Sequence, residues 1–409
     1  MNILFLTLLD FNSIYEPGLY QDLMAEFAEH RHQLYIISPI ERRKREKTHI
    51  VQEEKTTILK LRIGNMQKTN IIEKGISTIC IEPQYIRGIK KYFSDVKFDL
   101  ILYSTPPITF CKAIQYVKKK DSAKTYLLLK DIFPQNAVDI GLLSKTGIKG
   151  IIYRYFRKKE KVLYDISDRI GCMSEANVDY IVKHNPTISP DKVEVCPNCI
   201  KVRNTVLTDE EKRDMCQKYG FPLDKKIFVY GGNLGKPQDV PYIVRCMKAC
   251  SDVQDAYFVI AGSGTDRHYL ETYIGEENPS HVRLLGQLPK DEYDKMIGCC
   301  DVGLIFLDHR FTIPNFPSRM LSYMQAGLPI LACTDRNTDV GKVIVEGGFG
   351  WWCESNDTNV FAQKVSQMAL VELLNCKHYS REYLRDFYSV HSIYLEHFMP
   401  LSKETCNEM

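Results

Sequence analysis

Short runs of apolar residues, each suited to one buried β-strand, recur along the chain and alternate with segments of helical periodicity. Residues 3–9 form the first run, a helical pattern follows, and residues 33–39 form the second run. A strand, a helix and a strand in this succession build parallel sheets, and the chain must cover both faces of such a sheet. Further runs before residue 200 lie at 100–103, 125–129, 170–174 and 193–195. The first half is therefore predicted to be an α/β domain.

The same rhythm restarts after a polar stretch at residues 200–224. Apolar runs again alternate with helical patterns, at residues 227–230, 256–261, 282–286, 302–307 and 329–333. We therefore expect a second doubly wound parallel sheet and an interdomain cleft facing the carboxyl ends of both sheets. Ligands of open α/β sheets bind at those ends.

Composition places the chain among globular proteins of the cytoplasm. It has 409 residues, of which 44% are hydrophobic and 26% charged. The start lacks the basic region and cleavage site of a signal peptide, and no window approaches the ~18 apolar residues of a membrane helix. The 14 cysteines are expected to remain thiols. The pair Cys196 and Cys199, and the adjacent Cys299 and Cys300, are interpreted as buried structural thiols, and no metal site is expected.

The charge is distributed unevenly between the two halves. Residues 1–200 hold 31 Lys and Arg against 23 Asp and Glu, a balance of +8, and the remainder holds 23 against 28, a balance of −5. These balances sum to the net charge of +3. A basic first half indicates an anionic partner.

Two glycine-rich segments follow strands of the second half. Residues 231–238 read Gly-Gly-Asn-Leu-Gly-Lys-Pro-Gln, and residues 262–264 read Gly-Ser-Gly. Glycines at a strand end allow backbone N–H groups to approach a phosphate, and Lys236 adds a positive charge. An ordinary tight turn explains each segment equally well.

The segment from residue 316 to 329 predicts a short helix beside these turns. Ser318 is a suitable N-cap, so the helix is expected to run over residues 319–326 and to end at Gly327. Free N–H groups at its start and the guanidinium of Arg319 suit a diphosphate. The alternative is a capped helix that only packs against the core.

Taken in order and spacing, these segments resemble glycosyltransferase family 4. The resemblance rests on GGNLGKPQ, AGSG, VRLLGQLPKDEYDKMIGCCDVGLIFL and FPSRMLSYMQAGLPILA in the second half, and on EPGLYQDLMAEFAEHRHQLYIISP, KDIFPQ and CMSEANVDYIV in the first. It implies the GT-B fold, which has two facing Rossmann-like domains. It also implies sugar transfer from a UDP- or GDP-linked donor with retention of configuration, without a cofactor or a metal in the site.

The resemblance also assigns residues to the site. Asp131 is implied at the transferred sugar and acceptor, and Gly18 takes the glycine position of the first loop, although the usual double glycine is absent. The donor-binding positions are Asn233, Gly235, Lys236, Gln238, Gly262, Gln287, Leu288, Arg319, Met320, Leu321 and Ser322. Where many members carry two glutamates, this chain has Pro314 and Ser322. A serine hydroxyl forms a weaker bond to a ribose than a carboxylate does, so we favour a sub-branch with altered donor contacts.

A basic amphipathic stretch lies at residues 145–163 of the first half. It contains Lys145, Lys149, Arg154, Arg157, Lys158, Lys159 and Lys161, interleaved with apolar residues at helical spacing. Such a helix either binds an anionic membrane surface or packs on the core with a solvated basic face. Nucleic acid is not expected, because no aromatic residues alternate with the charges in a stacking pattern.

These observations predict a hexosyl- or N-acetylhexosaminyltransferase of surface polysaccharide biosynthesis, cytoplasmic and peripheral on the inner face of the cell membrane. Its acceptor would be a polyprenyl-diphosphate-linked or other saccharide. A sugar-nucleotide epimerase of the same fold and a catalytically silent fold-mate remain as alternatives.

The domain boundaries follow from the same patterns. Residues 1–200 are expected to bind the acceptor and residues 201–379 the donor. The C-terminal helix, residues 380–409, is too apolar for a free tail and is expected to return to the first domain.

Overall fold

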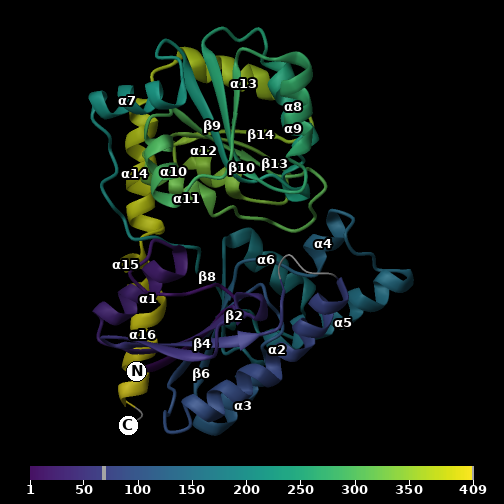
Figure 1. Ribbon diagram of the computed structural model, residues 1–409, viewed down its shortest axis with the longest axis vertical. Helices are drawn as coiled ribbons and strands as arrows, with labels where there is room; N and C mark the ends of the chain where they lie inside the picture. Colours follow the sequence, from purple (N-terminus) through teal and green to yellow (C-terminus); the bar gives the residue numbers. More distant parts are fainter. Residues whose placement is uncertain (67–70, 408–409) are drawn as a thin grey trace. The chain divides into compact units, whose positions relative to one another are not determined.

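A computed structural model describes residues 1–66 and 71–407, and the chain divides into two compact units. The first unit consists of Met1–Lys201 together with the segment from Val390 onward, and the second is Val202–Ser389. Figure 1 shows a sheet with covering helices in each unit. Residues 408 and 409 of the predicted returning helix lie outside the described residues.

The sheet of the first unit runs in the order β3-β4-β2-β1-β5-β6-β7-β8. Only β3 is antiparallel to its neighbour. The order reverses between β1 and β5, which is where open α/β sheets place their ligands. The strands are β1 (Asn2–Leu6), β2 (Gln33–Glu41), β3 (His49–Glu53), β4 (Thr56–Ile63), β5 (Leu100–Ser104), β6 (Lys124–Leu129), β7 (Arg169–Cys172) and β8 (Val193–Val195).

Helices connect these parallel strands and bury their apolar stripes on the sheet. In α1, for example, Leu23, Met24 and Phe27 are buried against the first strands. The helices are α1 (Leu19–Glu29), α2 (Ile71–Tyr92), α3 (Cys111–Asp121), α4 (Gln135–Asp139), α5 (Gly147–Ile166) and α6 (Glu175–His184), with 3-10 turns η1 (Arg42–Lys44) and η2 (Pro190–Lys192).

The sheet of the second unit is parallel throughout, in the order β11-β10-β9-β12-β13-β14. Its order reverses between β9 and β12, so the carboxyl ends there form the expected ligand position. The strands are β9 (Lys226–Asn233), β10 (Ala256–Ser263), β11 (Val282–Leu285), β12 (Val302–Phe306), β13 (Ile330–Thr334) and β14 (Gly350–Glu354). The last of these was not among the predicted strands.

Helices cover both faces of this sheet as well. The core beneath them gathers Phe228, Tyr230, Phe258 and Phe306 from the strands. The helices are α7 (Asp209–Tyr219), α8 (Val240–Ala249), α9 (His268–Glu277), α10 (Lys290–Gly298), α11 (Arg319–Gln325), α12 (Val340–Glu346), α13 (Thr358–Leu370) and α14 (Leu374–Phe387), with the 3-10 turn η3 (Lys236–Gln238). Two Rossmann-like α/β sheets confirm the predicted fold class.

The chain returns to the first unit after Ser389, later than expected. The predicted boundary at residue 380 is wrong, because α14 packs within the second unit, where the Tyr383 ring contacts the Phe349 ring with 5.0 Å between their centroids. The returning segment consists of α15 (Val390–Ile393), the π-helical turn η4 (Tyr394–Phe398) and α16 (Met399–Asn407). Figure 1 draws it in yellow beside α1.

Aromatic side chains attach this returning segment to the first unit. Phe398 lies 5.0 Å from Phe27 of α1 and 4.9 Å from Tyr126 of β6, centroid to centroid. Tyr394 packs edge-on to Phe27 and donates or accepts a hydrogen bond with His32 at 2.8 Å. The segment therefore completes the core of the first unit instead of lying on its surface.

Removing the chain from Val390 onward should consequently give an aggregating protein. Tyr394 and Phe398 are 2% and 0% exposed, and their loss uncovers the Phe27 side of the core. Each such side chain contributes about 1.5–3 kcal/mol when buried. Size-exclusion chromatography of the truncated chain beside the full chain measures this, and a monomeric, fully active truncation would contradict the packing role.

The cysteines from Cys80 to Cys376 are free thiols. Cys196, Cys199, Cys299 and Cys300 are each at most 6% exposed. Their interpretation as buried thiols is confirmed.

Candidate functional site

A cavity of about 510 Å³ opens at the carboxyl ends of β9 and β10, in the second unit. Its lining comes from these two strand ends, from the segment after β11, and from α10 and α11: Gly231, Gly232, Asn233, Ala261, Gly262, Ser263, Gln287, Leu288, Lys290, Tyr293, Arg319 and Ser322. The cavity lies beside the point where the strand order reverses. This is the position at which open α/β sheets bind nucleotides.

Two glycines allow the strand ends to form the floor of the cavity. A Cβ on Gly262 would lie 1.9 Å from the carbonyl oxygen of Gly232, and its φ of +154° is one that other residues rarely adopt. A Cβ on Gly232, whose φ is +136°, would lie 3.2 Å from the guanidinium carbon of Arg319. Both positions therefore require the close backbone approach that only glycine permits.

Arg319 supplies the main positive charge in this cavity. It begins α11, donates a hydrogen bond to the carbonyl of Gly231 at 3.2 Å, and places its guanidinium carbon 4.4 Å from the centroid of the Tyr230 ring. Among the described residues, no carboxylate forms an ion pair with Arg319. The guanidinium is thus positioned by a carbonyl and a ring while its charge stays available to an anion.

The tyrosines around Arg319 do not neutralise it. Burial raises the pKa of Tyr230, raises that of Tyr293 strongly and raises that of Tyr323 to about 12. All three are therefore neutral phenols at physiological pH. Tyr323 has a positioning role, because its hydroxyl accepts from the N–H of Gly231 and donates to the carbonyl of Leu304, both at 3.1 Å.

The loop after β9 is held by Gln238, one of the predicted donor-binding residues. Its Oε1 accepts from the side-chain amide of Asn233 at 2.9 Å and from the N–H of Gly235 at 3.4 Å. Asn233 lines the cavity, whereas Gly235, Lys236 and Gln238 lie outside its lining. Lys236 is exposed at the start of η3.

Helix α11 differs from the expected helix in its first turn. Ser318 has helical φ and ψ values, and its side chain makes no capping hydrogen bond, so the predicted N-cap role is wrong. The helix ends at Gln325, one residue early, before Gly327 at φ +70°. The Arg319 side chain carries a full positive charge, whereas the N-terminus of a helix is equivalent to roughly half a charge.

The resemblance implies that Met320 and Leu321 lie at the helix N-terminus that faces the phosphates, and the structure packs their side chains in the core. They are 0% and 3% exposed, respectively. Ser322, one residue further, does line the cavity. Pro314, where many family members have a glutamate, is buried.

Gln287 and Leu288, predicted to cradle the base, both line the cavity. Ser263 joins them, because its hydroxyl donates to Oε1 of Gln287 at 3.1 Å. Ser263, Lys290 and Tyr293 were not predicted individually, although all three lie in the segments that carried the resemblance. The sequence pattern around these three residues is the same as that around ordinary surface residues, so it does not mark them as part of a site.

The cavity lining contains no carboxylate among the described residues, and it carries two cationic side chains. Lys290 forms an ion pair with Asp294 one turn further along α10. Of the two cationic side chains, Arg319 is therefore the one whose charge is not paired with a carboxylate of the described chain. Oxygen-ligated cations such as Mg²⁺ are normally held by carboxylates. The lining therefore offers positively charged groups to an anion.

Asp131 lies in the first unit, directly after β6. Both of its carboxylate oxygens accept from the side-chain nitrogen of Asn136, at 2.8 and 2.7 Å. Thr105 donates to the Asp131 carbonyl at 3.1 Å and accepts from its N–H at 3.4 Å. Burial raises the pKa of Asp131 to about 6, although the Asn136 bond opposes this shift.

Gly18 is the residue before α1 in the same unit. Its φ of 173° is extended and its carbonyl accepts the N–H of Asp22 at 2.8 Å. The structure thus places Gly18 at a helix start after β1.

Comparisons with known proteins agree with this architecture. Residues 211–383 match the family model described as glycosyl transferases group 1. The chain is 24% identical over 345 residues to the probable glycosyltransferase WbjE of Pseudomonas aeruginosa, which covers 81% of this chain and 80% of that protein. It is 18% identical over 248 residues to the putative colanic acid biosynthesis glycosyl transferase WcaI of Escherichia coli strain K12, covering 60% of each.

A solved structure extends the fold comparison to the whole chain. HepE from Anabaena, in complex with UDP-glucose, superimposes with a TM-score of 0.66 at 11% identity, covering 100% of both chains. The predicted GT-B fold is confirmed in its two Rossmann-like sheets and its structural neighbours. Residues 211–383 are thus similar to the glycosyl transferases group 1 family, and most of the chain is similar to a protein named as a probable glycosyltransferase.

Proposed function

We propose that this protein transfers a sugar, with retention of configuration, from a UDP- or GDP-linked donor to a lipid-linked or saccharide acceptor during surface polysaccharide synthesis. The observation that carries the proposal is the cavity that Arg319 lines together with the glycines at the ends of β9 and β10. A nucleotide diphosphate requires close backbone approach and a cation, and Gly232, Gly262 and Arg319 meet both requirements. The cation would stabilise the diphosphate as it leaves the sugar.

The remaining lining suits the other parts of such a donor. Gln287 and Leu288 offer an amide and an apolar side chain to a base, and Ser322 offers a hydroxyl to a ribose. HepE, of the same fold, is described in complex with UDP-glucose, and WcaI is named for colanic acid biosynthesis. The first supports a nucleotide-sugar donor for this chain, and the second supports a polysaccharide product.

The family 4 assignment and metal-independent chemistry belong to the same proposal. They are supported by the ordered segments of the sequence and by a cavity lining without carboxylates. Asp131 would act at the sugar or acceptor, where a carboxylate orients a hydroxyl or stabilises positive charge on the anomeric carbon.

A panel of UDP- and GDP-sugars tests the function. Incubation with each donor and lipid-linked saccharide acceptors, followed by mass spectrometry, should show sugar transfer, or slow donor hydrolysis without an acceptor. Epimerised nucleotide sugar would identify an isomerase instead. Absence of nucleotide binding across the panel would identify a silent fold-mate and refute the proposal.

Helix α5 supports a membrane-held acceptor. Its apolar stripe divides: Leu163 is buried and Phe156 packs on Phe133 at 5.0 Å, but Ile148 and Ile151 are 82% and 61% exposed. Lys149, Arg154 and Lys158 lie exposed on the same helix, an arrangement typical of helices that lie on anionic membranes. No helix in the described part of the chain has the length and apolar content of a membrane span.

Two of the basic residues on α5 have structural partners. Arg157 pairs with Glu160 and donates to Asn185 at 2.6 Å, and Lys159 pairs with Glu82 at 2.8 Å. Arg157 and Lys159 therefore stabilise the fold, so a test of membrane binding should leave both unchanged. The exposed isoleucines offer a cleaner test.

Changing Ile148, Ile151 and Ile152 together to serine should abolish sedimentation with anionic phospholipid vesicles. An isoleucine side chain that the membrane buries fully contributes about 1.5–3 kcal/mol to the free energy of membrane binding. A basic residue near the membrane surface contributes about 1 kcal/mol. The matched control changes three exposed leucines of the second unit, Leu223, Leu370 and Leu374, to serine. Sedimentation of the isoleucine variant at the wild-type level would show that α5 is only a solvated face.

A further inference from the structure

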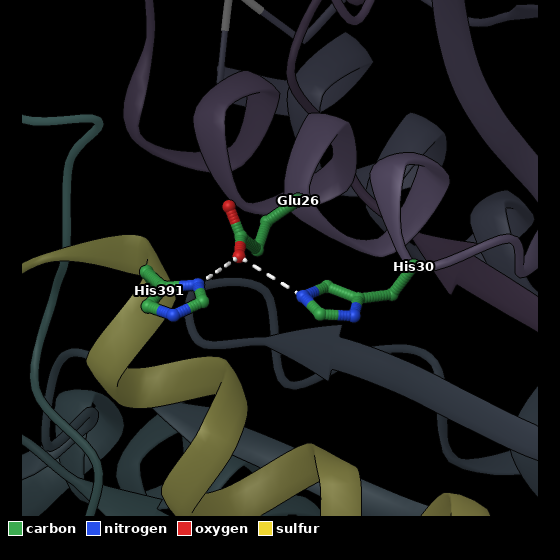
Figure 2. Close-up of side chains that lie close together, drawn as sticks. All are labelled: Glu26, His30 and His391. Carbon is green, nitrogen blue, oxygen red and sulfur yellow. Dashed lines mark hydrogen bonds and ion pairs between the residues drawn. The ribbon is translucent and has the colours of Figure 1, made fainter.

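Two histidines converge on one glutamate at the end of α1. Glu26 and His30 are one helical turn apart, and His391 comes from α15 of the returning segment (Figure 2). Residues four apart share a helix face, which explains why Glu26 and His30 point to the same place. His391 reaches it from 365 positions along the chain.

The three donor atoms lie close enough together to share one metal ion. Oε1 of Glu26 lies 3.3 Å from Nε2 of His30 and 2.9 Å from Nδ1 of His391, and all three atoms lie within 4.8 Å of one another. Bonds of about 2.0–2.1 Å in a tetrahedral zinc site place neighbouring donors about 3.3 Å apart. Small side-chain rotations would therefore bring all three onto one ion.

The surroundings hold the ligands while leaving the site open. The Glu26 side chain is 7% exposed, and the His30 ring stacks on Tyr394 with centroids 3.9 Å apart and planes at 14°. His391 is 64% exposed, so an ion can enter and a water can take a fourth position. A buried carboxylate shared by two imidazoles is a concentrated set of donors of the types that zinc prefers.

We propose that Glu26, His30 and His391 bind a zinc ion that fastens the returning C-terminal segment to α1. Two imidazole nitrogens and one carboxylate oxygen select zinc and similar transition metals over Mg²⁺ and Ca²⁺, which prefer oxygen ligands. The ion joins the two parts of the first unit that are farthest apart in sequence. It therefore stabilises the fold at His391, the second residue of the returning segment.

Zinc binding to the full chain, stripped with a chelator and kept reduced, tests this directly. Calorimetry should show one ion per chain, and zinc should raise the melting temperature because only the folded chain holds these three ligands together. Mg²⁺ should do neither. His30→Gln and His391→Gln should each weaken zinc binding at least about tenfold, since even residues behind a ligand contribute about 10–100-fold.

His378 provides a matched control. It forms a similar pair with Glu382, four residues on, at 3.1 Å, but no second histidine accompanies them among the described residues. His378→Gln should therefore bind zinc as the wild type does. Far-UV circular dichroism establishes that each of the exposed histidine variants is folded.

Cobalt(II) identifies the ligands independently of stability. The site should give weak visible bands without the ultraviolet charge-transfer band of thiolate ligands, and the bands should be lost in His391→Gln. Thiolate bands, unchanged zinc affinity in both histidine variants, or no zinc binding at micromolar concentrations would each overturn the proposal. The three side chains would then form only the hydrogen-bonded cluster of Figure 2.

Discussion

Replacing Asp131 with asparagine should lower sugar transfer by about two orders of magnitude or more, the usual range for a group that assists proton transfer or carries charge. Nucleotide affinity should be unchanged, because the cavity that we propose for the nucleotide is lined entirely by residues of the second unit. The measurement is kcat with a responsive donor and acceptor, beside calorimetry with UDP and GDP.

The ionisation of Asp131 gives this prediction a second readout. Burial raises its pKa from 3.8 to about 6, so the carboxylate is lost as the pH falls below about 6. If the carboxylate is the active form, kcat should rise with pH through about 6 and then level, and this limb should be absent in the variant. If kcat of Asp131→Asn still rises with pH through about 6, the rise is caused by the ionisation of another group.

The alternative is that Asp131 only orders the turn before α4. Its carboxylate accepts from Asn136, and an amide at this position retains one acceptor oxygen, so the turn should persist. A raised folded-state pKa adds stability below the unfolded pKa, and that stability is lost as pH rises through about 6. The variant should therefore lose this pH dependence of unfolding without becoming less stable at neutral pH. Normal turnover with that altered stability would leave Asp131 a purely structural role.

The strand ends near the nucleotide cavity illustrate what periodicity can predict. Continuous apolar runs identified β9 and β10, and the glycines at the ends of these two strands form the floor of the cavity. Parallel strands bring their carboxyl ends to one edge, so Asn233, Gly262 and Gln287 could be placed together without coordinates. Their arrangement in the structure follows from that rule.

Strands that depart from a simple apolar run were missed. In β4, Lys60 interrupts the pattern, yet it is only 4% exposed because its ammonium bonds Asp10, the Phe11 carbonyl and Asn12. A charged residue that is satisfied in this way looks like a surface position in the sequence. Strand β14 is short and begins at Gly350, where a Cβ would meet the Ile330 carbonyl at 1.9 Å.

Two further places show the limit of local patterns. The apolar residues around Tyr383 and Tyr394 read as one continuous helical segment, because no glycine or proline marks the change of unit at Ser389. Likewise, Met320 and Leu321 share a helix with Arg319, and sequence position alone does not show which side chains face the core. The histidine cluster joins residues too distant in sequence for any local pattern to reveal, and no metal site was expected.

Arg319→Ala should weaken UDP or GDP binding by about tenfold to a hundredfold, since a hydrogen bond to a charged group contributes about 1.5–3 kcal/mol. Arg319 is the cavity's less compensated cation, as its partners are the Gly231 carbonyl and the Tyr230 ring. Calorimetry measures the loss. Arg319→Lys keeps the charge but loses the planar fork, so its affinity should fall between the wild type and the alanine variant.

Lys236 is the informative comparison for this experiment. The resemblance to family 4 places it at the diphosphate, whereas the structure leaves its side chain exposed and outside the cavity lining. Lys236→Ala should therefore cost less than Arg319→Ala if the diphosphate lies under Arg319. Melting temperatures measured beside the affinities detect any collapse of the β9 loop, which Arg319 helps to hold through Gly231. Unchanged affinity in a folded Arg319→Ala variant would move the diphosphate away from this cavity, and a dominant effect of Lys236→Ala would place it along η3 instead.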